Sequence, residues 1–231
     1  MSAPRIVIEL KARMPLSQRV HRLCFVARSP FHWAAGQYLV VVVAQGQELF
    51  LPYSIASAHD PRKPGEFELA AAFRAGADAI DSLPIGAVIE VEGPFGDFTW
   101  QPSPGPAALL VGVGTGIAPL RALLEEELGR PSERRLILLA GHRAPEDVLF
   151  AEDFARLEQE HSRFRFVPTL TGAGDAWTGH HGRVQARLIE AARSLAVFDA
   201  YVCGRVDMVS DVVATLQATG VPPERIRSEG F

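Results

Sequence analysis

A short run near the middle of the chain, residues 110–120 (LVGVGTGIAPL), constrains its fold most. Apolar, strand-like residues lead into three glycines spaced two apart, Gly112, Gly114 and Gly116, and a helix-like segment follows. Glycine adopts positive φ readily and leaves room for a ligand where a Cβ would stand. A helix that begins at such a turn directs free N–H groups and the positive end of its dipole toward it, which favours an anion such as a pyrophosphate. Because the run lacks the G-x-G-x-x-G spacing and the Walker lysine, a tight turn without a ligand is the alternative.

The composition excludes several classes of protein. The chain has 231 residues, 48% of them hydrophobic, which suffices for one large domain or two of ordinary size. Its net charge of −4 argues against a nucleic-acid binder. The two cysteines, Cys24 and Cys203, lie far apart and do not have the spacing of metal ligands. The N-terminus does not resemble a signal peptide, and the longest apolar run, residues 38–44, is far too short for a membrane span. We therefore expect a cytoplasmic protein that binds neither nucleic acid nor a membrane.

The first hundred residues show strand patterns. Apolar alternation predicts strands near residues 6–10, 20–25, 38–43, 67–69 and 88–91, with glycine and proline between them. Short strands at such spacing predict an antiparallel barrel or sandwich. A short helix over residues 78–83 is also predicted, with Asp78 as its N-cap.

The pattern changes after residues 101–106 (QPSPGP), which cannot continue a strand or a helix. Strands are predicted over 107–112, 135–140, 164–168 and 201–203, and they alternate with helices over 117–128, 152–160, 184–193 and 208–218. This alternation predicts a parallel sheet with crossover helices on both faces. The predicted fold is thus β + α/β in two domains, an antiparallel β-barrel over residues 1–103 and a Rossmann-like α/β domain over residues 104–231.

Two segments of the second domain are expected to face one cleft. Ligands of open α/β sheets bind beyond the carboxyl ends of the strands. Residues 112–115 and 203–204 both fall at such ends.

The segment LPYSIAS, residues 51–57, stands out in the first domain. Tyr53 could lie along a flat ring system and Ser54 could hydrogen-bond a ring nitrogen. Considered without its context, the segment is more typical of a barrel strand with ordinary serines.

Several motifs in one order carry a resemblance to a known family. The order is AGQYL at 35–39, LPYS at 51–54, GPFGDF at 93–98, the glycine turn, CGR at 203–205 and a terminal EGF at 229–231. It resembles the ferredoxin–NADP reductase superfamily over nearly the whole chain, and most closely the small NAD(P)H:flavin oxidoreductases. The resemblance implies an FR-type flavin-binding barrel, an NAD(P)-binding domain, and hydride transfer from NADH or NADPH to FAD, FMN or riboflavin.

The resemblance also implies roles for individual residues. Catalytic roles fall to Ser54, Cys203 and Glu229. The implied flavin-binding residues are Pro52, Tyr53, Ser54, Ile55, Phe73, Gly76 and Phe231. The implied NAD(P)-binding residues are Gly112, Gly114, Thr115, Gly116, Pro119, His142, Arg143, Cys203, Gly204, Arg205 and Met208. Hydride transfer needs the two reacting rings within roughly 3–3.5 Å of each other, and it requires no covalent nucleophile.

Some of these residues have simpler alternatives. Cys203 could be a small buried hydrophobic side chain, and Phe231 could be a frayed terminus. His180 and His181 are more typical of a polar loop than of a metal site, which needs three or four ligands. We therefore expect no metal.

The sequence departs from the family where a flavin phosphate would bind. The family's arginine is Leu51 here, which removes a charged fork suited to phosphate. In the second phosphate-binding segment, after Gly76, Ala79 replaces a serine and Asp78 adds a negative charge, although Arg74 could compensate in part. We therefore expect a weakly held flavin that acts as a substrate.

The dinucleotide preference depends on the turn after the second α/β strand. Arg143, or His142 when protonated, could meet a 2′-phosphate; equally, Arg143 could merely begin a surface loop. No acid follows immediately, so rejection of NADPH is not built into this turn. We expect NADH to be preferred and NADPH to be tolerated.

Two other functions fit the motifs. One is a reductase subunit with bound FAD that passes electrons to a separate ferredoxin, oxygenase or other metalloprotein. The other is a flavin- or nucleotide-binding module without turnover, which the retained Ser54, Cys203 and glycine turn argue against.

Overall fold

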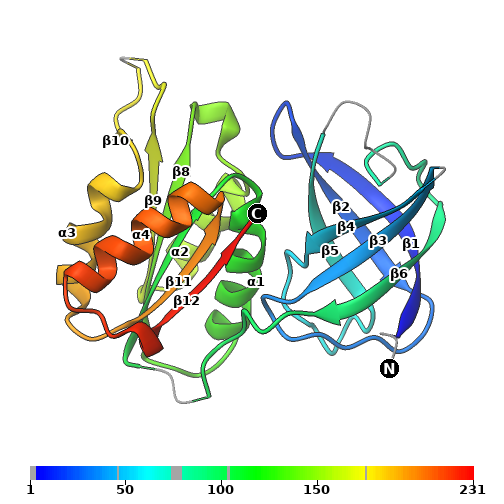
Figure 1. Ribbon diagram of the computed structural model, residues 1–231, viewed down its shortest axis with the longest axis horizontal. Coiled ribbons are helices and arrows are strands. Elements are labelled where there is room, and N and C mark those ends of the chain that lie inside the picture. The colour runs from blue at the N-terminus through cyan, green and yellow to red at the C-terminus, as the bar shows by residue number, and fades with distance from the viewer. Residues whose placement is uncertain (1–3, 46, 74–79, 103–104, 175) are drawn as a thin grey trace.

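The protein forms two sheets that lie side by side (Figure 1). The computed structural model describes residues 4–45, 47–73, 80–102, 105–174 and 176–231, without the side chains of residues 42–49. The predicted boundary between residues 103 and 104 lies outside the described residues. None of the helices in these ranges is long and apolar enough to cross a membrane.

The first sheet is antiparallel and has the strand order β4-β3-β6-β1-β2-β5. Its strands are β1 (Arg5–Pro15), β2 (Val20–Ala27), β3 (Tyr38–Gln45), β4 (Gln47–Ser54), β5 (Glu66–Ala72) and β6 (Val88–Phe95). A bridge between Ile55 and Leu69 joins the end of edge strand β4 to edge strand β5. This contact closes the sheet at one end, and Ile8, Leu23 and Leu39 fill its interior. The predicted antiparallel barrel is confirmed.

The short helix predicted over residues 78–83 is wrong in its described part. Asp78 and Ala79 lie outside the described residues, and Ile80, Asp81 and Ser82 form a turn. Ile80 is buried in the barrel core, and the buried Asp81 carboxylate lies 2.8 Å from His21 Nδ1. These tertiary contacts, together with Pro84 shortly after, favour a turn over a helix.

The second sheet has the order β10-β9-β8-β7-β11-β12, and all of its pairs are parallel. Its strands are β7 (Ala107–Val113), β8 (Arg135–His142), β9 (Phe164–Leu170), β10 (His180–His181), β11 (Asp199–Gly204) and β12 (Ile226–Gly230). The helices are α1 (Ile117–Leu128), α2 (Ala151–Glu160), α3 (Gln185–Leu195) and α4 (Val206–Ala218), with 3₁₀ turns at Gly114–Gly116, Pro145–Asp147 and Pro223–Arg225. The predicted parallel sheet is confirmed. Strands β10 and β12 were not predicted, and His180 and His181 form an exposed edge strand where a loop was expected.

The residues of β7 show why helices cover both faces of this sheet. Ala108 and Leu110 point into a cluster with α1 and α2, whereas Leu109 and Val111 point into a cluster with α3 and α4. The strand is therefore apolar on both faces, as expected for a central parallel strand.

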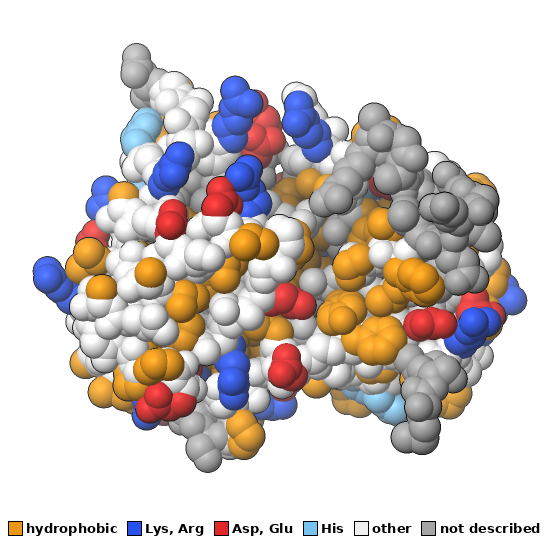
Figure 2. Space-filling view, in the orientation of Figure 1, with side chains coloured by type: hydrophobic (Ala, Val, Ile, Leu, Met, Phe, Trp, Pro, Cys, Tyr) orange, Lys and Arg blue, Asp and Glu red, His pale blue; other side chains and the backbone are white. Residues whose placement is uncertain are grey.

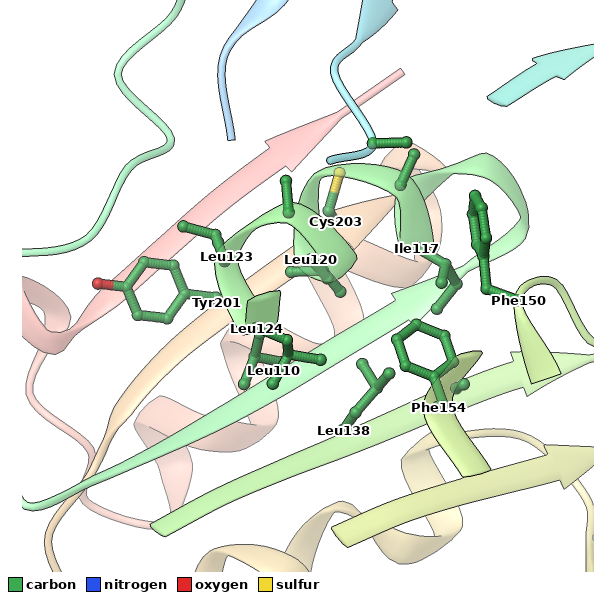
Figure 3. Close-up of a cluster of buried hydrophobic side chains, with 14 of the residues drawn as sticks. Leu110, Ile117, Leu120, Leu123, Leu124, Leu138, Phe150, Phe154, Tyr201 and Cys203 are labelled. Atoms are coloured by element: carbon green, nitrogen blue, oxygen red, sulfur yellow. The ribbon is translucent and has the colours of Figure 1, made fainter. Parts of the chain in front are cut away.

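The first of these clusters also joins the two sheets. Figure 3 shows Ile117, Leu120 and Leu123 of α1 beside Tyr201 and Cys203 of β11. The same cluster contains buried barrel-side residues, namely Val20, Ala35, Ala56, Ala70 and Phe98. Helix α1 thus packs between the parallel sheet and the barrel (Figure 1). A shared apolar core of this kind restricts relative movement of the two halves.

Candidate functional site

The glycine turn lies at the carboxyl end of β7. Gly114 has φ +54°, and a Cβ built there would meet nothing within 4 Å. In the described residues no side chain caps the 3₁₀ turn or the start of α1. The backbone N–H groups therefore face an open space that fits a phosphate or pyrophosphate group.

The turn touches the carboxyl end of β11. A Cβ built on Gly116 would stand 2.4 Å from the carbonyl oxygen of Cys203 and 2.7 Å from the Cα of Gly204. The two strand ends therefore lie against each other; that both face one cleft stays a prediction. Gly112 has a different role, because it is buried and its missing Cβ makes room for Ile117 and Leu120 of α1. Pro119 is also buried.

A cavity of about 740 Å³, here called the interdomain cleft, opens beside this turn. Predicted residues in its lining are Gly114, Thr115, His142, Arg143, Arg205, Met208 and Phe231. The hairpin between β1 and β2 adds Ser17, Arg19 and Val20, so both halves of the protein form the lining. Figure 2 shows blue Lys and Arg side chains gathered where the two halves meet at the top of the view.

Several arginines in this cleft are available to an anionic ligand. Arg205 is paired with Asp207, with Nη2 donating to Oδ2 at 2.8 Å. Arg19, Arg143 and Arg183 also line the cleft, and none of them makes a salt bridge with a described residue. Arg19 and Arg183 were not predicted. No sequence pattern identifies Arg19, because only the packing of the two halves brings its hairpin to the cleft.

His142 cannot supply the predicted positive charge. Its side chain is buried, and burial lowers its pKa to about 4. The ring is therefore neutral at physiological pH, and the proposed contact between a protonated His142 and a 2′-phosphate is wrong. Arg143, which is exposed, keeps its charge.

Cys203 and Glu229 lie directly opposite each other in the parallel pair β11–β12. Burial raises the pKa of the Cys203 thiol, and the nearby Glu229 carboxylate raises it further, so the thiol is neutral. The side chain is fully buried in the cluster of Figure 3, which supports a packing role. Burial, together with repulsion from Asp97, raises the pKa of Glu229, and its buried Oε2 has no hydrogen-bond partner among the described residues.

The predicted flavin-binding strand ends at Ser54. In the pairing of β3 with β4, Tyr53 lies opposite Leu39 and Ser54 lies opposite Tyr38. Neighbouring residues of a strand point to opposite faces, so Tyr53 packs against the barrel core while Ser54 and Tyr38 share the other face. The Tyr38 ring, opposite Ser54, is 5.7 Å from that of Phe95 on the next strand, β6, and neither ring was assigned a role from the sequence.

The other predicted flavin residues occupy different environments. Ile55 is fully buried in the barrel core, which is better suited to packing than to ligand contact. Phe73 and the terminal Phe231 are 57% and 52% exposed, so both rings are available to a ligand. Gly76 lies outside the described residues. Leu51 packs against the barrel core and offers no charge.

No described group of three or more histidine, cysteine, aspartate or glutamate residues is placed to hold a metal ion. The open glycine turn suits an anionic dinucleotide.

Comparison with known proteins assigns each half of the chain to a domain family. Residues 7–100 match the oxidoreductase FAD-binding domain, and residues 110–214 match the oxidoreductase NAD-binding domain. Ferredoxin–NADP reductase B of Sorangium cellulosum is 34% identical over 96% of this chain and 96% of its own length. An NAD(P)H-flavin reductase of Vibrio harveyi is 29% identical over 88% of each chain. The reductase subunit of an Amycolatopsis aromatic O-demethylase is 30% identical over 94% of this chain, which spans 66% of that subunit.

Solved structures agree with this fold. The Amycolatopsis cytochrome P450 reductase GcoB superposes with a TM-score of 0.85 at 26% identity, covering 99% of this chain and 70% of that one. The ferredoxin reductase of carbazole 1,9a-dioxygenase has the same fold, with a TM-score of 0.86 at 21% identity, over 100% of this chain and 70% of that chain. With a 34% identical relative matched over 96% of both chains and both domain types present, this chain belongs to the ferredoxin–NADP reductase family of FAD- and NAD-binding oxidoreductases.

Proposed function

We propose that the protein transfers hydride from NADH or NADPH to a flavin that it holds weakly, as a substrate. The observation that carries this proposal is the interdomain cleft, in which the open glycine turn and residues of the barrel line one cavity. In this proposal residues 1–103 bind the flavin and residues 104–231 bind the dinucleotide. The bound cofactors supply the hydride chemistry, and the protein supplies position and electrostatic environment.

The residues have distinct proposed roles. The N–H groups of the Gly114–Gly116 turn bind the pyrophosphate of the dinucleotide. Gly204 stands at the nicotinamide end, where its missing Cβ makes room for the side chains of Val113 and Met208. Ser54 donates or accepts a hydrogen bond at the flavin ring edge, with Tyr38 opposite it on β3 and Phe95 next to Tyr38 on β6. Glu229, whose pKa is raised by burial, is able to hold a proton near the end of β11.

Weak flavin binding is supported by Leu51. At this position the side chain packs on the barrel core and does not present a guanidinium to a phosphate. Riboflavin, which has no phosphate, is then as good a substrate as FMN or FAD. Arg143 allows NADPH to bind as well as NADH.

The test is the absorbance of the purified protein together with its turnover. We expect little flavin absorbance after gel filtration, and rapid NADH oxidation when riboflavin, FMN or FAD is added. A stoichiometric flavin that survives gel filtration would refute the substrate role. Absence of NAD(P)H oxidation with all three flavins would refute the proposed enzymatic activity.

A second candidate is a reductase subunit with bound FAD that serves a separate acceptor protein. It is favoured by the 30% identity to the Amycolatopsis reductase subunit. In that case a tightly bound FAD is present, and NADH oxidation rises strongly when a ferredoxin is added.

The predicted cytoplasmic location stays a prediction.

A further inference from the structure

A single buried guanidinium on α1 connects the two proposed cofactor sites. Arg121 lies about one helical turn beyond the glycine turn, and only 6% of its side chain is exposed. Its Nη1 donates to Glu68 Oε2 of β5 at 2.8 Å. Its Nη2 lies 2.8 Å from Glu125 Oε1 of the same helix, and its Nε lies 2.9 Å from Asp153 Oδ2 of α2. One side chain thus ties α1 to both the barrel and the second helix.

The same guanidinium reaches the chain that carries Ser54. Arg121 Nη1 also donates to the backbone carbonyl of Ala56 at 2.7 Å, two residues beyond Ser54. The neighbouring acids of α1 extend this contact, because Ala58 N–H donates to Glu125 Oε2 at 3.0 Å and Ala35 N–H donates to Glu126 Oε2 at 3.2 Å. Helix α1 therefore holds the backbone that follows β4 by hydrogen bonds as well as by apolar packing.

The shape of the guanidinium group makes this contact specific to an arginine. Arg22 of β2 pairs with Asp153, and Arg22 and Arg121 both lie over the Phe150 ring, at 4.9 and 4.7 Å from its centroid. Two guanidinium groups thus face the three carboxylates of Glu68, Glu125 and Asp153. A guanidinium can meet several acceptors in fixed directions, whereas an ammonium group is a single point of charge. Loss of one partner from such a buried group leaves carboxylates without compensation.

We propose that Arg121 is a positioning residue for hydride transfer. It fixes the N-terminal turn of α1, where the dinucleotide binds, relative to the end of β4, where the flavin binds. This inference rests on the proposed function. Hydride transfer is sensitive to small displacements, and an error of about 1 Å between reacting groups lowers rates by roughly 100-fold. Neither ligand touches Arg121 in this proposal, so its loss affects the rate of transfer and not the binding of either ligand.

The kinetic test compares Arg121→Lys with Arg121→Met in single-turnover flavin reduction. Arg156→Lys is the control, since Arg156 lies on α2 with 55% of its side chain exposed and, among the described residues, its guanidinium pairs with Glu160 away from this contact. For Arg121→Lys we expect the reduction rate to fall by roughly tenfold or more, while the Kd values for NAD⁺ and for riboflavin change less than about threefold. Arg121→Met is expected to show a larger loss of rate. An unchanged rate, or a rate that falls only in proportion to ligand binding, contradicts the proposal.

Hydrogen exchange on the ligand-free protein gives a readout that needs no turnover. In Arg121→Lys the Ala35 and Ala58 amides, which donate across the interface, are expected to exchange at least several-fold faster, with amides of β7 unchanged. Unchanged protection at Ala35 and Ala58 would overturn the role of Arg121 whether or not the protein reduces flavins. Failure of the proposed function would appear instead in the wild-type protein, as a lack of NAD(P)H oxidation.

Discussion

The carbonyl oxygen of Cys203 closes over Gly116 so tightly that a Cβ on that glycine would stand only 2.4 Å away. The backbone of Gly116 has φ −61°, which any residue can adopt. Glycine is therefore required here by space and not by conformation. This contact fixes the start of α1 against the end of β11, and thereby sets the shape of the glycine turn.

Gly116→Ala is expected to damage both stability and dinucleotide binding. The methyl group forces α1 away from β11, which costs about 1–3 kcal/mol of unfolding free energy as an overpacked core does. The KM for NADH should rise at the same time. Urea unfolding and steady-state kinetics measure the two effects. Gly174→Ala is the control, because a Cβ at Gly174 meets nothing within 4 Å; equal effects of the two substitutions would contradict the steric argument.

Leu51→Arg is expected to restore affinity for phosphorylated flavins. A guanidinium that hydrogen-bonds a phosphate contributes about 1.5–3 kcal/mol, so the Kd for FMN and FAD should fall roughly tenfold or more. Riboflavin has no phosphate, and its Kd should not change. Titration of flavin fluorescence with the variant protein gives these constants. Leu51→Gln controls for loss of the apolar side chain, and a gain for riboflavin equal to that for FMN would disprove the interpretation.

His142 is expected to make the protein less stable in acid. Its folded pKa of about 4 lies below the reference value of 6.5. Between these pH values the unfolded chain takes up a proton that the folded protein does not, so stability falls as the pH drops from 6.5 to 4. The loss is at most roughly 3 kcal/mol. His142→Gln should flatten this part of the profile of unfolding free energy against pH. His180→Gln, on the exposed strand β10, is the control that separates the effect of burial from the mere removal of an imidazole. An unaltered slope in His142→Gln would show that the lowered pKa of His142 does not cause the loss of stability in acid.

Arg143→Ala is expected to reduce the use of NADPH more than that of NADH. The arginine lines the cleft and makes no salt bridge with a described residue, so a 2′-phosphate is a natural partner for it. Loss of such a charged hydrogen bond is worth about 1.5–3 kcal/mol, or roughly tenfold or more in kcat/KM for NADPH. The ratio of kcat/KM for the two donors is the measurement. Arg193→Ala on α3 is the control, and equal losses for NADH and NADPH would show that Arg143 does not contact a 2′-phosphate.

The amino-acid sequence by itself determined the two architectures and the position of the glycine turn that we propose binds the dinucleotide. Alternating residues and glycine–proline punctuation predicted the barrel strands, and the apolar run before Gly112 predicted a central parallel strand, because both signals are local in the chain. Strand β12 escaped prediction, since Ile226–Gly230 (IRSEG) is short and polar, and only pairing with β11 makes it a strand.

Tertiary structure alone decided which side chains meet between the halves. In the sequence Arg121 and Glu125 form an i,i+4 pair that is typical of a solvent-exposed helix face. In the folded protein the barrel covers that face, so the same arginine is buried and bonded to Ala56 and Glu68. Arg19 comes to the cleft in the same way, and His142 loses its charge because neighbouring residues remove water from it. Burial and long-range contact depend on the packing of distant segments, and no local pattern encodes them.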